Sequence, residues 1–302
     1  MSRWLFALLG VLVAISARGQ GLSVVDARGH VLQINQPVTR IVALAPHFVE
    51  NLHAIGAGEL LVGALGGMEV PGQRADLPSV GSHAGINAEA VLALRPDLVL
   101  AWLSGNGEAV VRRLEGLGLT VLTEEPRDIE DIAASLRQLG RIAGREAAAE
   151  RVAERFLSEL ADLTRTYAAA RPVRVFYQIW HEPLQTLNGE HLVSRLIELC
   201  GGRNVFYDAP VLAPRVSLEA VIAAKPELIV GGGSGADDGA QLAIWRRWTA
   251  IPAVATGHVY GIDPDPIQRF TPRMVKGART LCGLIERARM PAAIEDPDHA
   301  QH

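Results

Sequence analysis

Cysteines and aromatic residues are scarce in this sequence. Only two of its 302 residues are cysteines, Cys200 and Cys282, and aromatic side chains make up 5%. Two thiols without neighbouring ligands do not complete a tetrahedral zinc site, and their spacing is not that of a CxxC redox pair. The pair therefore predicts either one structural disulfide or two buried free thiols.

A net positive charge is also lacking, as are long apolar segments beyond the first residues. The formal net charge is −4 and no run of Lys and Arg occurs, which argues against a nucleic-acid partner. After residue 20, no segment has the uninterrupted apolar length of a membrane helix.

Sequence signatures of catalysis are missing as well. The motifs HExxH and GxSxG do not occur, and the glycine-rich run 231–235 lacks both GxGxxG spacing and the ending of a phosphate-binding loop. Glu50 and His53 could suggest acid–base chemistry, but they stand three positions apart on an expected helix and can pair on its face. We expect no enzyme, no catalytic residue and no cofactor. A metal-dependent enzyme is the alternative from another class.

The first residues have the layout of a secretory signal peptide. Arg3 precedes the apolar run 4–15, and the small residues Ala17 and Gly19 stand where a signal peptidase would cut. The run is too short to span a bilayer comfortably, and no cysteine follows it that could carry a lipid anchor. We expect residues 1–19 to be removed, with an uncleaved membrane anchor as the alternative.

Apolar segments of strand length alternate with segments of helical period along the remaining chain. The expected strands are 40–45, 60–64, 98–102, 119–122, 173–177, 227–230 and 259–260. Helical patterns occur at 49–56, 87–94 and 108–117. This alternation indicates an α/β fold whose parallel sheets are covered on both faces.

One unit of the sequence occurs twice. The segment 89–102 (EAVLALRPDLVLAW) matches the segment 219–232 (EAVIAAKPELIVGG), an offset of 130 residues (219 minus 89). Each copy is a helix that begins with Glu and is stopped by Pro96 or Pro226, after which an acid and an apolar strand follow. Two copies in equivalent places predict two lobes of similar build.

A long helical segment separates the two copies. Residues 145–170 contain no Gly or Pro, and an apolar stripe follows helical spacing. We predict one stiff helix of about 39 Å that joins the lobes and restricts their motion. The predicted organisation is an N-terminal lobe (20–144), the connecting helix (145–170), a C-terminal lobe (171–289) and a disordered tail (290–302).

Five segments carry a family resemblance. They are 40–63 (RIVALAPHFVENLHAIGAGELLVG), 85–102 (GINAEAVLALRPDLVLAW), 175–206 (VFYQIWHEPLQTLNGEHLVSRLIELCGGRNVF), 214–233 (PRVSLEAVIAAKPELIVGGG) and 267–285 (IQRFTPRMVKGARTLCGLI). These segments resemble the BtuF-like periplasmic cobalamin-binding proteins, which are class III solute-binding proteins of ABC transporters. The resemblance spans residues 38–288. It implies two Rossmann-like lobes joined by one long rigid helix, a corrinoid held between them, a monomer in the periplasm and a Cys200–Cys282 disulfide.

The resemblance gives the repeated acids a role. In this family, one Glu on the surface of each lobe docks into arginine pockets of the permease dimer, and Glu89 and Glu219 stand at the matching positions. The alternative is that each acid only begins a helix, where the macrodipole favours negative charge.

The resemblance also implies a ligand cleft. The matching cleft positions are Pro46, Trp102, Trp180 with Pro183, Asp265 and Arg269. His47, His83 and His181 fall in expected cleft loops, and our hypothesis is that His47 or His83 approaches the metal face or an amide arm of the ligand.

Some positions depart from the family pattern. The segment 66–71 lacks the family's cleft tyrosine, and His83 and Ala213 stand where aromatic residues are common. A thinner aromatic wall keeps haem, a ferric siderophore or a metal ion open as alternative ligands. An accessory protein that binds only a partner is a further possibility.

Overall fold

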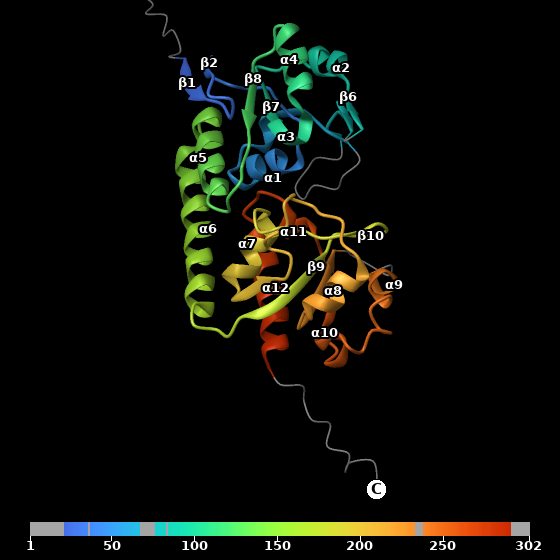
Figure 1. Ribbon diagram of the computed structural model, residues 1–302. Coiled ribbons are helices and arrows are strands. Elements are labelled where there is room, and N and C mark those ends of the chain that lie inside the picture. Colours follow the sequence, from blue (N-terminus) through green and yellow to red (C-terminus); the bar gives the residue numbers. More distant parts are fainter. Residues whose placement is uncertain (1–20, 36, 67–75, 83, 233–237, 291–302) are drawn as a thin grey trace, which may run out of the picture.

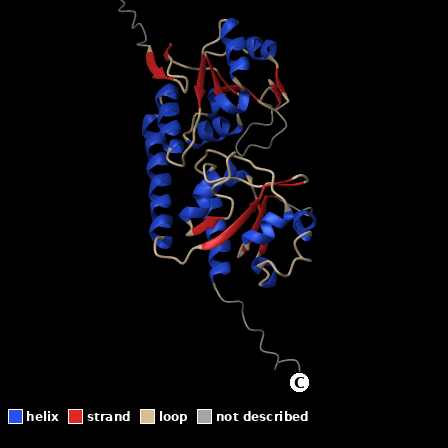
Figure 2. Ribbon diagram, in the orientation of Figure 1, coloured by secondary structure: helices blue, strands red, loops and turns tan. Residues whose placement is uncertain are grey.

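The computed structural model describes residues 21–35, 37–66, 76–82, 84–232 and 238–290 (Figure 1). The predicted signal peptide 1–19, His83 and residues 291–302 of the predicted tail lie outside the described residues. Two four-stranded parallel sheets form the framework, each flanked by helices as Figure 2 shows. The expected α/β class with two parallel sheets is confirmed.

The first sheet has the strand order β4-β3-β7-β8. Its strands are β3 (Ile41–Ala43), β4 (Leu61–Ala64), β7 (Leu98–Trp102) and β8 (Val121–Glu124). They are apolar apart from Thr123 and Glu124 at the end of β8, because helices cover both faces of the sheet. Those helices are α1 (Pro46–Ala54), α2 (Ala88–Ala93), α4 (Glu108–Gly116) and α5 (Asp131–Ala143).

The second sheet has the strand order β12-β9-β13-β14. Its strands are β9 (Val173–Gln178), β12 (Gly202–Asn204), β13 (Leu228–Gly232) and β14 (Val259–Ile262). The helices of this lobe are α7 (Leu192–Leu199), α8 (Leu218–Ala224), α9 (Asp238–Ala243), α10 (Pro252–Ala255), α11 (Asp265–Gln268) and α12 (Met274–Arg289). If the four strands of each sheet are numbered in chain order, they lie side by side in the order 2-1-3-4 in both sheets. The lobes therefore share one topology.

The repeated sequence unit forms the same structure in each lobe. The helices α2 and α8 are capped by Asn87 and Ser217, whose side chains accept hydrogen bonds from the equivalent backbone amides. Among the described non-glycine residues, only Arg95 (φ 46°) and Lys225 (φ 47°) have positive φ, and each directly precedes the proline of its copy. A left-handed residue before a proline ends the helix and turns the chain into the strand.

One long helix, α6 (Glu146–Tyr167), runs beside both sheets (Figure 1). Its 22 residues correspond to about 33 Å of rise. It begins one residue after the predicted start and ends three before the predicted end, where Ala168 forms its C-terminal boundary. α5 and α6 pack together and cover one side of the molecule.

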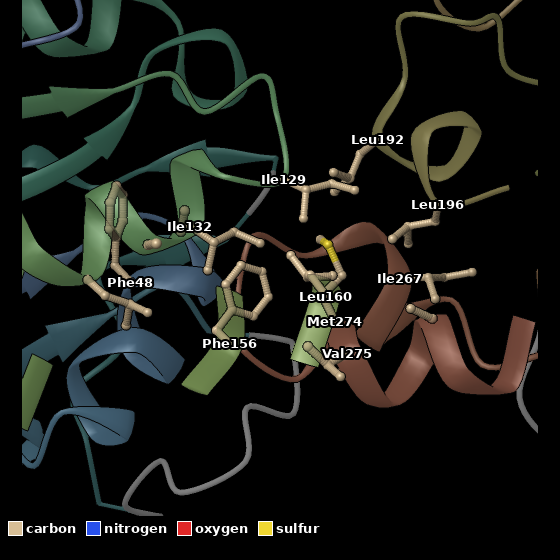
Figure 3. Packing of buried hydrophobic residues seen from close by; sticks show 14 of the residues in the cluster. Phe48, Ile129, Ile132, Phe156, Leu160, Leu192, Leu196, Ile267, Met274 and Val275 are labelled. Atoms are coloured by element: carbon tan, nitrogen blue, oxygen red, sulfur yellow. The ribbon is translucent and has the colours of Figure 1, made fainter. Parts of the chain in front are cut away.

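An apolar core continues from one lobe into the other along α6. Phe156 of α6 lies beside Ile132 of the first lobe, and Leu160, one turn further along α6, lies beside Met274 of α12 in the second, as Figure 3 shows. All four side chains are buried. Separate apolar clusters fill the outer faces of the two sheets. The continuous core therefore ties the lobes together on the side of the connecting helix.

Shorter elements complete the fold. They are β1 (Leu22–Val25), β2 (Val31–Ile34), the 3₁₀ turn η1 (Gly58–Leu60), β5 (Gly81–Ser82), β6 (Gly85–Ile86), α3 (Leu103–Asn106), β10 (Trp180–His181) and β11 (Leu184–Gln185). Cys200, at the end of α7, forms a disulfide with Cys282 of α12, so the implied pairing is confirmed. Within the described residues, no helix has the length and apolarity needed to cross a membrane.

Candidate ligand-binding site

The strand order of each sheet defines where a ligand site should lie. In the first sheet β3 and β7 are neighbours, and the chain continues from β3 to β4 on one side and from β7 to β8 on the other. In the second sheet the neighbours β9 and β13 are followed by β12 and β14 on opposite sides in the same way. Open α/β sheets bind ligands outside the carboxyl ends of the strands at such a reversal. Pro46 and His47 follow β3, Trp102 ends β7, and Trp180 follows β9. These four predicted cleft residues therefore stand at the expected edges.

A cavity of about 560 Å³ lies between the lobes, and of these four predicted residues Trp102 lines it, whereas Pro46, His47 and Trp180 do not. Trp102 and Phe270 supply an aromatic wall from opposite lobes, and Leu212 adds apolar surface. Charged groups stand around this wall, among them Arg127 of the first lobe and Arg195 of the second. The remaining lining residues are Ser104, Glu125, Pro126, Asp128, Glu190, His191, Leu192 and Gln268. A mixed aromatic and polar wall suits a ligand with an apolar body and polar arms.

Two neighbours that sequence reasoning missed hold Trp102 in place. The side chain of Asn106 accepts a hydrogen bond from the backbone amide of Trp102 (2.7 Å) and donates one to the carbonyl of Leu44 (2.7 Å). Asn106 thus ties the ends of β3 and β7 together. The indole lies across Gly105, where an added Cβ would come within 2.1 Å of the ring. The AWLSGN sequence at 101–106 contains both small and amide residues, which is the signal that could have indicated this support.

His47 lies on a helix rather than in the predicted loop. α1 begins at Pro46, three residues before the expected helix, because proline suits the first helical position. The imidazole is buried and packs against Phe48, Trp102 and Phe270, with ring centroids 4.2, 5.9 and 6.4 Å away. Burial, reinforced by the nearby Arg269 charge, lowers the pKa of His47 to about 3, so the ring is neutral. Its Nε2 has no hydrogen-bond partner among the residues that the structure describes.

Trp180 and His181 form an exposed hairpin on the second lobe. β10 pairs with β11, and the peptide bond between Glu182 and Pro183 at the turn is cis. The indole is 53% exposed, its Nε1 donates to the carbonyl of Glu182, and its ring lies 5.6 Å from that of His181. An exposed tryptophan here is available for contact with a ligand or partner. The placement of His83, the third histidine of the predicted set, is outside the described residues.

Asp265 and Arg269 form the ion pair that their spacing in the sequence suggests. The guanidinium Nη2 lies 2.7 Å from Oδ2 of Asp265, one turn away. The same guanidinium reaches the other lobe, because its Nη1 donates to Oε1 of Glu50 at 2.8 Å. Gln268 and Phe270, on either side of Arg269 in the sequence, line the cavity. Arg269 therefore lies in the chain between two residues that line the cavity, and is not itself part of the lining.

Glu50 was expected on a helix, but its role in joining the two lobes was not predicted from the sequence. Its side chain is only 4% exposed, and Arg273 is a second partner at 3.2 Å from Oε2. The neighbouring Asn51 donates from Nδ2 to the carbonyl of Phe270 (3.1 Å). These contacts join α1 of the first lobe to the segment 269–273 of the second. A glutamate among the buried apolar residues of α1 indicates that Glu50 needs a cationic partner. The sequence does not identify that partner, because Arg269 and Arg273 lie more than two hundred positions away.

The two predicted docking acids occupy equivalent exposed positions. Glu89 is the second residue of α2 and Glu219 the second residue of α8. Glu89 pairs with Arg113 of α4 at 2.9 Å, with side chains 76% and 59% exposed. A hydrogen bond from its own backbone N–H and one with the Ser217 hydroxyl lower the pKa of Glu219. Both carboxylates are accessible to a partner.

Within the described part of the chain, no group of three or more His, Cys, Asp and Glu side chains could hold a metal ion. His47 is buried beside the cavity wall and His181 is exposed on its hairpin, so these two histidines differ in accessibility.

This architecture, two parallel-sheet lobes with a cavity between them and one helix along their side, defines a two-lobed solute-binding protein. The chain belongs to the periplasmic binding protein family, whose profile matches residues 41–266. It is 33% identical over 254 residues to the vitamin B12-binding protein of Vibrio cholerae, an alignment that covers 84% of this chain and 91% of that protein.

Solved structures give the same fold. The periplasmic vitamin B12-binding protein BtuF of Vibrio cholerae superposes with a TM-score of 0.78 and 32% identity, covering 84% of this chain and 99% of that one. The periplasmic haem-binding protein RhuT from Roseiflexus sp. RS-1 gives a TM-score of 0.73 at 23% identity, covering 84% and 100%. The second similarity is one of fold alone.

Proposed function

We propose that this chain captures a corrinoid, cobalamin or cobinamide, between its lobes and delivers it to the permease dimer of an ABC importer. It would do so as a monomer in the periplasm, after removal of residues 1–19, and without catalysing a reaction. The observation that carries the proposal is the inter-lobe cavity with Trp102 and Phe270 on opposite lobes, in a chain one-third identical to a vitamin B12-binding protein.

The chemistry of the cavity supports this ligand class. A corrinoid is a wide disc with apolar faces and amide arms, so it needs aromatic contact and a few fixed polar groups. Trp102 and Phe270 offer the first. Arg127 and Arg195 line the cavity and offer the second, and Arg269, which lies in the chain between the lining residues Gln268 and Phe270, would add a third guanidinium. Trp180 is exposed on the second lobe and would supply further aromatic surface.

Haem is the second candidate ligand, and one observation favours it. The His47 ring is neutral, so its Nε2 can bind a metal when Nδ1 carries the proton, and no described residue forms a hydrogen bond with this Nε2. A haem iron would take such a nitrogen if lobe opening exposed it. A ferric siderophore or a free metal ion has no comparable observation in its favour.

Competition between ligands tests the proposal. The purified protein is mixed with equal amounts of cyanocobalamin, cobinamide and haemin, passed through a desalting column, and the protein fraction is examined by visible absorbance. We expect a corrinoid spectrum in the protein fraction. A haem spectrum alone would transfer the conclusion to the second candidate, and a colourless fraction would refute both.

The delivery step has its own test. Radiolabelled corrinoid uptake is measured in vesicles that contain the importer and enclose ATP, with wild-type protein or a Glu89→Gln/Glu219→Gln double variant added outside together with the corrinoid. We expect the double variant to bind corrinoid normally and to support little uptake. Unimpaired uptake would show that these acids serve only their helices.

A further inference from the structure

The contact between the lobes is built around one buried carboxylate. Glu50 belongs to α1, on the first lobe, and it pairs with Arg269 and Arg273 of the second lobe at 2.8 and 3.2 Å. The three side chains are 4%, 14% and 37% exposed, respectively. A carboxylate this buried is stable only when cations or hydrogen-bond donors compensate for its lost hydration. Separation of the lobes would therefore remove the partners of Glu50 and return it to water.

The same contact fixes one wall of the cavity. The segment 268–273 contributes Gln268 and Phe270 to the cavity lining, and Arg269 lies between them. Three groups of this segment are held from the first lobe. Glu50 holds the guanidinium groups of Arg269 and Arg273, and the Asn51 amide holds the Phe270 carbonyl (3.1 Å). The conformation of this wall thus depends on whether the lobes are together.

Arg269 is held from both sides. Asp265, on the same lobe, engages Nη2 at 2.7 Å, while Glu50 engages Nη1. Asp265 is 44% exposed and forms a pair that a single turn of chain can make in any lobe arrangement. Glu50 is the anchor that exists only when the lobes are together. Arg273 provides Glu50 with a second cation, so the buried carboxylate keeps an ion-pair partner if Arg269 turns toward a ligand.

We propose that Glu50 is a positioning residue that couples lobe closure to ligand recognition: it latches the two lobes together and, in doing so, orients Arg269 at the ligand cavity. The recognition half of this inference rests on the proposed function, because it treats Arg269 as a ligand contact. The latch half does not, since it concerns the ligand-free protein.

The latch is tested without ligand. The described part of the chain has no free cysteine, so single cysteines can be introduced at the exposed positions Leu117 and Ala255, one per lobe, and spin-labelled. Double electron–electron resonance then reports the distance between the lobes. We expect one narrow distance distribution for the wild-type background and a broader or longer one for Glu50→Gln. The control is Glu108→Gln, which removes the exposed pair with Arg112 inside α4 of the first lobe and should change nothing. Identical distributions for wild type and Glu50→Gln would overturn the latch.

The recognition half is tested by a double-mutant cycle on cyanocobalamin affinity. If Glu50 acts through Arg269, Glu50→Gln weakens binding about tenfold or more when Arg269 is present, and by less than about twofold in an Arg269→Gln background. A purely structural role predicts equal losses in both backgrounds, and that result, or no loss at all, would overturn the positioning role. If Glu50→Gln does not fold, Glu50→Asp keeps the charge while withdrawing it by one methylene and takes its place in both tests. Absence of corrinoid binding by the wild type would refute the proposed function and the recognition half, while the distance measurement still decides the latch.

Discussion

Glu89 and Arg113 form an exposed ion pair that has no counterpart among the described residues of the other lobe. The offset of 130 residues that relates Glu89 to Glu219 also relates the start of α4 at Glu108 to the start of α9 at Asp238. It places Ala243 where Arg113 would be. Among the described residues, no ion pair of Glu219 is found. The two acids are thus equivalent in position but unequal in their present partners.

This inequality predicts unequal contributions to docking. Arg113 competes with a permease arginine for Glu89, so Glu219→Gln should weaken docking more than Glu89→Gln does. Exposed ion pairs contribute about 0.2–1 kcal/mol, so the difference should be between about 1.5-fold and fivefold. Binding to the importer in nanodiscs measures it, and Arg113→Gln should raise affinity by removing the competitor. A larger effect of Glu89→Gln would contradict the prediction.

Glu124 makes stability depend on pH. It is buried at the end of β8, it accepts a hydrogen bond from Ser135 (2.6 Å), and burial raises its pKa to about 7. Because the folded-state pKa lies above the ordinary value, the protonated form favours the fold below about pH 4.5, and this stability is lost as pH rises through 7.

The replacement Glu124→Gln should remove that loss. We expect the variant to be more stable than the wild type by about 1–3 kcal/mol at pH 8 and nearly equal to it at pH 4. Urea denaturation at both pH values measures the difference, with the exposed Glu130→Gln as control. A variant that is destabilised at pH 8 would show that the carboxylate is stabilised by groups other than Ser135.

Phe156 carries the apolar contact between the lobes. It is 2% exposed and packs in the core that continues from the first lobe into the second. Phe156→Ala should lower the free energy of unfolding by about 3–5 kcal/mol. It should also speed amide hydrogen exchange around Ile129 and Met274 more than in either sheet. Arg155→Ala, on the exposed side of α6, is the matched control. Faster exchange confined to one lobe would contradict the bridging role.

The repeated unit explains how much of the fold could be predicted. Its Pro96 and Pro226 end helices by local sterics, and the same apolar strand follows each, so sequence alone indicated two similar lobes. Boundaries were less accurate where turn residues decide them. The strand expected at 119–122 lies at 121–124, because Gly118 adopts φ +83° and delays it.

The candidate site was predictable only in part. Trp102 could be placed because it ends a predicted strand, whereas Trp180 was placed by the family resemblance. The partners of Glu50 could not, since Arg269 is 219 positions away and the contact depends on how the lobes sit together. His47 was assigned to a loop because Pro46 was taken to lie outside the helix, whereas it is the first residue of α1.

Calorimetric titration with cyanocobalamin tests the central claim most directly. We predict saturable binding with one ligand per chain, and a loss of affinity of about tenfold or more in Trp102→Ala, whose folding is verified by circular dichroism. Cobinamide, titrated in parallel, shows whether the nucleotide arm contributes. No heat with either corrinoid, or equal affinity in the wild type and Trp102→Ala, would contradict corrinoid capture between the lobes.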